Sequence, residues 1–141
     1  MIPEKEVSSL VAHVLAIKKL SKSSLVKAGC VIHGTDGIVY TGYNGNGYLG
    51  SALENGEGKA NPGVIHAEAD AIAEACRKGT HTLLGAIMVV TLAPCINCAA
   101  LISNTGIKAV WYIDDWDKAA LDLLKAHGIS VRKLKIIHKK P

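Results

Sequence analysis

The sequence predicts an α/β fold with three layers, in which a five-stranded mixed sheet lies between helices. Three observations predict it: an amphipathic segment at the N-terminus, two short β-type runs after it, and then three alternations of helix and strand patterns. Strands joined through helices should pair in parallel with right-handed crossovers, and the helices should cover the sheet. The chain of 141 residues has the length of one domain, so we expect a single domain over 1–141.

The first half of the chain is expected to contain one helix, one hairpin and a long loop. Apolar residues at helical spacing predict an amphipathic helix over residues 5–20. Residues 28–33 and 38–42 have the pattern of short strands, and the Asp36-Gly37 pair between them is a strong hairpin signal. Residues 43–63 are rich in Gly and Asn and show no periodicity. A loop this long inside a compact domain is usually functional or mobile.

The second half is expected to alternate helix and strand. A helix should open near Asn61-Pro62 and run to Gly79, because proline is tolerated in a first turn. The remaining elements, in chain order, are a strand, a helix after Pro94, a strand, a helix closed by Gly128 and a last strand: 86–91, 95–106, 109–113, 118–127 and 131–134. The first of these strands is a continuous apolar run, typical of a strand buried on both faces. Ligands should gather where strand ends meet helix starts.

Composition and charge exclude several classes of protein. Apolar residues make up 49% of the chain and charged residues 20%, as in an ordinary globular protein. No apolar stretch is long enough to span a bilayer, and the first residues lack the order of a secretory signal. We therefore expect a cytoplasmic protein. The net charge of +4 suits an anionic substrate. The basic residues near the C-terminus are expected to form a solvated end: Arg132, Lys133, Lys135, Lys139 and Lys140.

Two segments, His66-Ala67-Glu68 and Pro94-Cys95-Ile96-Asn97-Cys98, have the spacing of a metal site. Two thiolates at C-x-x-C spacing in the first turn of a helix can reach one ion, and the N–H groups of that turn favour the thiolate form. An imidazole at the start of another helix supplies a third ligand. Three protein ligands leave the fourth tetrahedral position of zinc to water, which is typical of a catalytic site. We therefore predict one Zn²⁺ ion held by His66, Cys95 and Cys98.

Glu68 is the candidate proton shuttle of this site. Zinc lowers the pKa of bound water from about 15.7 toward about 7, and a carboxylate in the same turn as the histidine ligand could take a proton from that water. Each feature alone has an ordinary alternative. The C-x-x-C pair could be a redox pair, His66 a structural histidine, and Glu68 a solvated carboxylate at a helix start. Their combination, with Pro94 before the first cysteine, favours the metal site.

The sequence also contains residues whose role its pattern leaves open. Asn44 ends the second strand between Gly42 and Gly45, which let the backbone turn sharply or approach a ligand. It could equally be an ordinary turn residue. The remaining cysteines, Cys30 and Cys76, are expected to be small core residues rather than ligands.

These motifs resemble those of the cytidine deaminase superfamily, and most closely those of the deoxycytidylate (dCMP) deaminases. H-A-E at 66–68 and P-C-x-x-C at 94–98 match the signature of the zinc deaminases. G-Y-N-G at 42–45 and N-P-G-V-I-H-A-E at 61–68 are similar to the dCMP branch, and the likeness spans nearly the whole chain. The resemblance implies a cytidine-deaminase-like fold. It also implies hydrolytic deamination of dCMP to dUMP, by attack on C4 of cytosine and loss of ammonia.

The resemblance also implies substrate contacts. The backbone of Ala67 would hold the pyrimidine carbonyl, and Asn44 would bond the 3′-hydroxyl of the deoxyribose. Family members have an arginine just before the first strand. At that place this chain has Leu25 and Val26, so that Lys27 is the nearest cation for a phosphate.

A substrate-binding tyrosine is also found shortly after the fourth strand of family members. In this chain that place falls on Trp116 or Asp117, and Tyr112 inside the strand is a further candidate. Some members hold a second, structural zinc with Cys and His from the long loop. Because no Cys or His occurs between Gly34 and Ile65, we expect one zinc ion per chain.

Assembly and regulation follow from the resemblance alone. Compact members are homo-oligomers, commonly hexamers, and many are activated by dCTP and inhibited by dTTP. We therefore expect a nucleotide substrate and a homohexamer, with any such effector, and the Mg²⁺ accompanying it, at the Gly-rich loop from Gly42 to Gly58. Membranes and nucleic acids are not expected partners.

Two other functions stay open from the sequence. The same metal centre could deaminate another base substrate, namely deoxycytidine, a modified cytosine nucleotide, guanine or a tRNA adenosine. A non-catalytic, zinc-stabilised binding module would leave Glu68 idle and would need a fourth protein ligand, because structural zinc usually has four.

Overall fold

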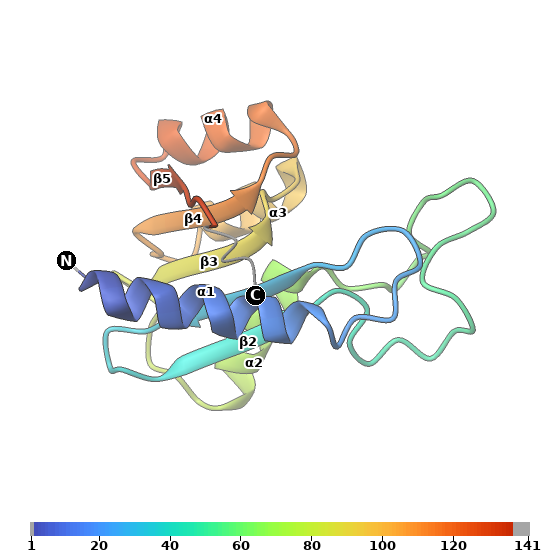
Figure 1. The fold of residues 1–141 in the computed structure, drawn as a ribbon, viewed down its shortest axis with the longest axis horizontal. Coiled ribbons are helices and arrows are strands. Elements are labelled where there is room, and N and C mark those ends of the chain that lie inside the picture. Colours follow the sequence, from blue (N-terminus) through green and yellow to red (C-terminus); the bar gives the residue numbers. More distant parts are fainter. Residues whose placement is uncertain (1, 137–141) are drawn as a thin grey trace, which may run out of the picture.

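The structure is a computed structural model that describes residues 2–136, and it confirms the three-layer α/β architecture (Figure 1). One helix lies on one face of a five-stranded sheet and three lie on the other. The helices are α1 (Glu4–Lys18), α2 (Ala67–Arg77), α3 (Ile96–Ser103) and α4 (Lys118–Ala126). The strands are β1 (Gly29–His33), β2 (Val39–Tyr43), β3 (Ile87–Leu92), β4 (Ala109–Asp114) and β5 (Ser130–Lys133).

The strand order brings four separate segments to one edge of the sheet. The order is β2-β1-β3-β4-β5, with β3, β4 and β5 parallel and β1 antiparallel to both β2 and β3. The carboxyl ends of β2, β3 and β4 therefore lie at the same edge as the start of β1. Residues from the loop before β1 and from the segments after β2, β3 and β4 meet there, as expected for a ligand site in an open α/β sheet.

Both faces of the sheet are buried, which explains the continuous apolar run of β3. Met88 and Val90 point toward α2, α3 and α4, whereas Ile87 and Val89 point toward α1. On the α1 side they pack with Val14 and other apolar residues of the amphipathic helix. The prediction of a strand covered on both faces is confirmed.

The prediction of a helix opening near Asn61-Pro62 is wrong, because α2 begins at Ala67. The Val64 N–H donates to the Asn61 carbonyl at 3.2 Å and closes a turn. Gly63 then takes a φ of +87°, which breaks any helix. His66 is extended, with a ψ of 158°, and forms the N-cap of α2. The predicted long loop thus reaches to His66, and it extends away from the sheet in Figure 1.

Helix α2 lies unusually close to the edge strand β2. Gly42 has no side chain at the contact, and a Cβ there would lie 2.5 Å from the Ala67 carbonyl oxygen and closer still to the Ala71 amide nitrogen. Both atoms belong to the helix backbone, which cannot move aside without displacing the first turn of α2. Glycine is therefore required at position 42 for this packing.

Two carboxylates of α2 reinforce the same contact. The Tyr43 N–H donates to the Asp70 carboxylate at 3.0 Å, and the Thr41 N–H donates to Glu74. Because β2 is the last strand of the sheet, these N–H groups have no neighbouring strand as partner on that side. The carboxylates fill that role and fix the helix along the strand.

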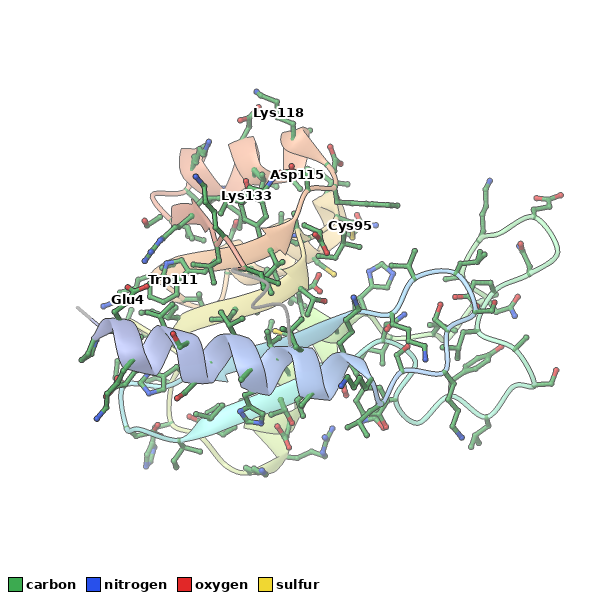
Figure 2. All side chains as sticks on the ribbon, viewed as in Figure 1. Glu4, Cys95, Trp111, Asp115, Lys118 and Lys133 are labelled. Atoms are coloured by element: carbon green, nitrogen blue, oxygen red, sulfur yellow. The ribbon has the colours of Figure 1, made fainter. Side chains whose placement is uncertain are left out.

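The basic C-terminal segment is described only in part, since Lys139 and Lys140 lie outside the described residues. Lys133 donates to Asp115 at 2.5 Å, and the Arg132 guanidinium lies 5.4 Å from the centre of the Trp111 ring (Figure 2). Both side chains stay exposed. Of the described residues, no helix is both long and apolar enough to cross a membrane.

Replacing Gly42 with Ala should lower the free energy of unfolding by about 1–3 kcal/mol, because the added methyl group overpacks the contact with α2. Gly56→Ala is the matched control, since nothing lies within 4 Å of a Cβ at that position. Urea denaturation of both variants and the unaltered protein measures the difference. Equal stability of the two variants would contradict the requirement for glycine at position 42.

Candidate active site

The side chains of the predicted metal site come from the starts of two helices that point to the same place. His66 and Cys95 are the N-cap residues of α2 and α3, and both are extended, with ψ values of 158° and 170°. Their carbonyls accept from the Asp70 and Ala99 N–H groups at 2.9 Å. Neither side chain caps its own helix, so both can face the space between the helices.

The distances within this group fit a tetrahedral zinc ion. The Nδ1 atom of His66 lies 3.5 Å from the Sγ atom of Cys95 and 3.4 Å from that of Cys98. The usual Zn–S and Zn–N bond lengths at a tetrahedral angle require about 3.6 Å between such atoms. Within the described part of the chain, this is the one group of three or more potential metal ligands. Its soft sulfur donors suit zinc better than magnesium.

The surroundings of the Cys98 thiol also favour a nearby cation. Burial raises the pKa of the Cys98 thiol well above its ordinary value, and the nearby Glu68 and Cys95 raise it further. A thiolate is therefore unfavourable at this position unless a positive charge joins it. The N-terminus of α3 supplies a partial positive charge, and a metal ion would supply the rest.

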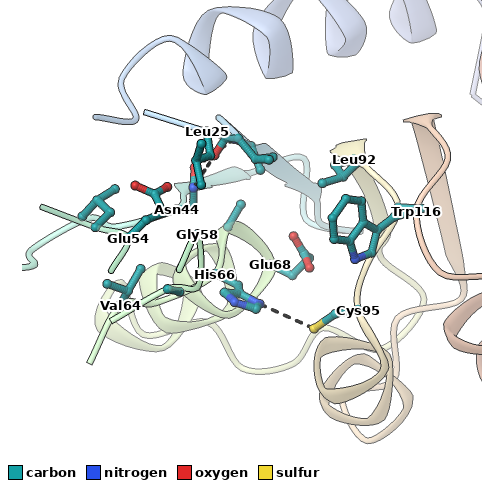
Figure 3. Close-up of a pocket in the computed structure, with 16 residues that line it drawn as sticks. Leu25, Asn44, Glu54, Gly58, Val64, His66, Glu68, Leu92, Cys95 and Trp116 are labelled. Atoms are coloured by element: carbon teal, nitrogen blue, oxygen red, sulfur yellow. Dashed lines mark hydrogen bonds between the residues drawn. The ribbon is translucent and has the colours of Figure 1, made fainter. Parts of the chain in front are cut away.

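Glu68 lies in the first turn of α2 with its side chain buried, at 5% exposure. Figure 3 shows its carboxylate directed into the space between His66 and Trp116. Burial raises the pKa of this carboxyl, whereas the Cys98 thiol and the His66 ring lower it in part. The site thus contains a carboxyl group that is able to hold a proton closer to neutral pH than an exposed glutamate does.

A cavity of about 220 Å³ opens directly on His66, Cys95 and Glu68. Ala67, the first residue of α2, also lines this cavity. Most of its remaining wall is apolar, and the largest of these residues are Leu25, Val26, Leu53, Val64, Leu92 and Trp116. An apolar cavity with a few convergent polar groups is typical of a small-molecule site.

Asn44 lies in the cavity wall, and its side chain is held by the backbone of the neighbouring segment. Its Oδ1 atom accepts from the Ala28 N–H at 2.8 Å, and its Nδ2 atom donates to the Val26 carbonyl at 2.8 Å. An amide has two donor hydrogens and two acceptor lone pairs. One donor and one acceptor position therefore remain for a ligand, in a fixed orientation.

The structure brings most of the predicted site residues together, but not all of them. Ala67, Asn44 and Trp116 line the cavity, and Trp116 is 62% exposed at its rim. Lys27 is not among the lining residues and faces an adjoining hollow. Tyr112 is 8% exposed within the core on β4 and does not reach the cavity either.

Glu54 lines the cavity, although no sequence signal indicated it. Its carboxylate accepts from the Ser23 hydroxyl, and from the N–H and the hydroxyl of Ser24 at 3.4 and 3.3 Å. In Figure 3 it lies on the side of Asn44 and Leu25, away from Cys95. Glu54 lies in the aperiodic loop, where no motif or spacing links it to the other site residues. Its position at the cavity is therefore visible only in the structure.

Comparison with known proteins agrees with this geometry. Residues 4–114 match the family described as the cytidine and deoxycytidylate deaminase zinc-binding region, and they include His66, Cys95 and Cys98. The chain belongs to this family. The resemblance stated from the motifs is thereby confirmed, and the family is a zinc-binding one, as the three ligands predict.

Two relatives within the family are deoxycytidylate deaminases. The enzyme of Mus musculus is 36% identical over 137 residues, covering 87% of this chain and 75% of the mouse protein. The enzyme of Enterobacteria phage T2 is 44% identical over 70 residues, covering 48% of this chain. The chain spans only 37% of that phage enzyme's length.

A solved structure shares the fold over almost the entire length. The dCMP deaminase of the cyanophage S-TIM5, crystallised in complex with dCMP and dUMP, has a TM-score of 0.84 and 26% sequence identity. The match covers 95% of this chain and 99% of the cyanophage chain. The cytidine-deaminase-like α/β fold is thus confirmed by structure as well as by sequence.

Cys98→Ser should reduce the zinc content of the purified protein from about one ion per chain to well below it, because one of three ligands is lost. Cys76→Ser is the control, because Cys76 lies exposed on α2 and outside the cluster, so the prediction of a core position is wrong for Cys76. Elemental analysis of the dialysed proteins measures both. Full zinc content in Cys98→Ser, or loss of zinc in Cys76→Ser, would contradict the assignment of ligands.

Proposed function

We propose that this chain catalyses the hydrolytic deamination of dCMP to dUMP and ammonia. The observation that carries the proposal is a buried carboxylate, Glu68, beside a cluster of three potential metal ligands, two of which, His66 and Cys95, line the same apolar cavity. The substrate class is supported by the cyanophage enzyme, whose complex contains dCMP and dUMP.

His66, Cys95 and Cys98 would hold a zinc ion, which when bound would supply an activated water as the nucleophile. Zinc with a structural role usually has four protein ligands. The cluster within the described residues offers three, and it opens on a cavity rather than on packed core. This arrangement favours a catalytic site over a zinc-stabilised binding module.

Glu68 would carry the protons of the reaction. Its carboxylate accepts a proton from the attacking water and donates it to the ring nitrogen of cytosine. It then transfers the remaining proton, from the hydroxyl group of the C4 adduct, to the amino group, which leaves as ammonia while the C4 carbonyl forms. Its burial favours this exchange, because the charged and neutral forms of a desolvated carboxyl are closer in free energy at neutral pH. The route requires Glu68 to face both the water and the base, as its place in the cavity wall allows.

The cavity would orient the base and the sugar at two fixed points. The Ala67 N–H is the first of α2, so it has no partner within the helix and can donate to the pyrimidine carbonyl. The free donor and acceptor positions of Asn44 would bind the 3′-hydroxyl of the deoxyribose. Leu92 and Trp116 would contact the apolar faces of the base.

Assembly and regulation stay predictions from the resemblance to the family: a homohexamer, with dCTP and dTTP as effectors and an accompanying Mg²⁺ ion. The cytoplasmic location stays a prediction from the sequence pattern. A single domain over 1–141 is likewise a proposal.

Glu68→Gln should lower the rate of dCMP deamination at least 10²–10⁴-fold, about the contribution of a positioned acid–base group, while zinc stays bound. Glu57→Gln, in the exposed part of the long loop, should leave the rate unchanged. The rate of dUMP formation and the zinc content of the same samples are measured together. A fully active Glu68→Gln variant would rule out the proton shuttle.

The zinc-loaded protein should convert dCMP to dUMP faster than it converts deoxycytidine to deoxyuridine. The phosphate of dCMP can form charge-assisted hydrogen bonds that deoxycytidine lacks. Both reactions are followed under the same conditions by chromatography. Absence of dCMP turnover in folded, zinc-containing protein would reject dCMP. Deoxycytidine, a modified cytosine nucleotide, guanine or tRNA adenosine would then be tested as the substrate.

A further inference from the structure

Asn44, the proposed contact for the sugar hydroxyl, is held from one side by the segment before β1. Its side-chain amide bonds the backbone of Val26 and Ala28, as described above. The Asn44 N–H donates to the Ala28 carbonyl at 3.2 Å, and the Asn44 carbonyl accepts from the Ser21 hydroxyl at 3.1 Å. None of these bonds reaches α2, which carries Glu68. They fix Asn44 relative to β1 alone.

The residues on either side of Asn44 supply the link toward α2. The Tyr43 N–H donates to the Asp70 carboxylate at 3.0 Å, and the Gly45 N–H donates to the Ile65 carbonyl at 2.8 Å. Ile65 belongs to the loop before the helix, whereas Asp70 belongs to its first turn. Asp70 is therefore the residue of α2 that bonds the backbone directly next to Asn44.

Asp70 also bonds the backbone of a residue in the metal cluster. Its N–H donates to the His66 carbonyl at 2.9 Å, within the first turn of α2. Figure 3 shows His66 and Glu68 at one part of the cavity wall and Asn44 at another. Asp70 connects these two parts although it does not line the cavity itself.

The surroundings of Asp70 make this connection rigid. The side chain is buried, at 4% exposure, and a buried carboxylate is costly unless its oxygens are hydrogen-bonded. Besides the Tyr43 N–H, the carboxylate accepts from Nδ2 of Asn46 at 3.2 and 3.3 Å. It forms no ion pair among the described residues, so its partners are neutral donors at the end of β2. Because hydrogen bonds to a charged acceptor are roughly twice as strong as neutral ones, the carboxylate holds this strand end firmly.

We infer that Asp70 is a positioning residue, which holds Asn44 where the 3′-hydroxyl of a deoxynucleotide can reach it while the base lies beside Glu68. The inference rests on the proposed function, which places the sugar at Asn44 and the base at Glu68. Asp70 acts through the backbone of Tyr43 and does not touch the substrate. Its loss releases the end of β2, so that the 3′-hydroxyl no longer contributes to binding although the base still fits.

Glu74 provides a matched comparison on the same helix. Its carboxylate also accepts from a backbone N–H of β2, but from that of Thr41, three residues before Asn44. Loss of either carboxylate removes a bond between α2 and the edge strand, so both changes should lower stability. Only the loss of Asp70 frees the residue next to Asn44.

The test measures how much the 3′-hydroxyl adds to binding by the zinc-loaded protein. Calorimetry gives the Kd for dUMP and for 2′,3′-dideoxyuridine monophosphate, which lacks only that hydroxyl. The ratio of the two Kd values is determined for the unaltered protein and for D70A, D70L, D70N and E74A. D70A and D70L both remove the acceptor, and D70L keeps the branched shape of the side chain. KM and kcat are measured for dCMP and for 2′,3′-dideoxycytidine monophosphate.

The unaltered protein should bind dUMP about five- to tenfold more tightly than the dideoxy compound, as expected for one hydrogen bond. In D70A and D70L this ratio should fall to about twofold or less, because the bond is lost. KM for dCMP should rise by the same factor, whereas kcat and the KM for the dideoxy substrate should change by less than about twofold. D70N, whose amide oxygen can still accept from the Tyr43 N–H, and E74A should keep the ratio of the unaltered protein.

An unchanged ratio in D70A and D70L would overturn the inference. So would an equal fall of the ratio in E74A, or a fall in D70N as large as that in D70L. If D70A and D70L both fail to fold while E74A folds, Asp70 is required for the fold itself and the inference fails as well.

These measurements separate the inference from the proposed function. If dCMP is deaminated but the ratio is unchanged in D70A and D70L, the reaction stands and the positioning role fails. If the ratio falls as expected but dCMP is not turned over, the positioning role stands and the proposed reaction fails. Equal binding of dUMP and the dideoxy compound by the unaltered protein would reject the contact of Asn44 with the hydroxyl, and this inference with it.

Discussion

The close contact between α2 and β2 at Gly42 is the constraint on which the site depends. The helix backbone lies nearer to the strand than any side chain at that position would permit, and Asp70 and Glu74 hold it there through the N–H groups of β2. The first turn of α2 carries both Ala67, which makes this contact, and Glu68. Packing at the edge of the sheet and the position of the carboxylate in the cavity are therefore set by the same few atoms.

The charged groups of the site also depend on one another for their stability. The buried thiol of Cys98, the half-buried thiol of Cys95, the buried carboxyl of Glu68 and two helix N-termini are brought together. No Lys or Arg is found among the described residues that line the cavity. The helix ends favour negative charge, but burial opposes it. A divalent cation held by His66, Cys95 and Cys98 would resolve the conflict and would stabilise the negative charges of the site. Among the described residues, no lysine or arginine lines the cavity to balance the charge of a phosphate.

The order of elements and the clustering of His66, Cys95 and Cys98 could be predicted because both rest on local patterns. The apolar run of β3 and the helical spacing of α1 are short-range patterns, and the C-x-x-C spacing fixes two ligands within one turn. The start of α2 was misplaced because the proline signal at position 62 is weaker than the turn closed by Asn61 and Gly63. Contacts between residues that are distant in the sequence are not encoded in such local patterns. The contact of Glu54 with Ser23 joins residues 31 positions apart, which no short sequence window contains together.

The hydrogen bonds from β2 to Asp70 and Glu74 have a consequence for how copies of the chain can meet. A bare outer strand can extend its sheet into that of another molecule, which is a common route to aggregation. Here two backbone donors of β2 are already occupied by side chains of α2, and at the opposite border β5 presents Arg132 and Lys133. Continuous sheets running from one molecule into the next are disfavoured at both borders. Any association between copies would therefore use the helical faces and loops rather than the outer strands.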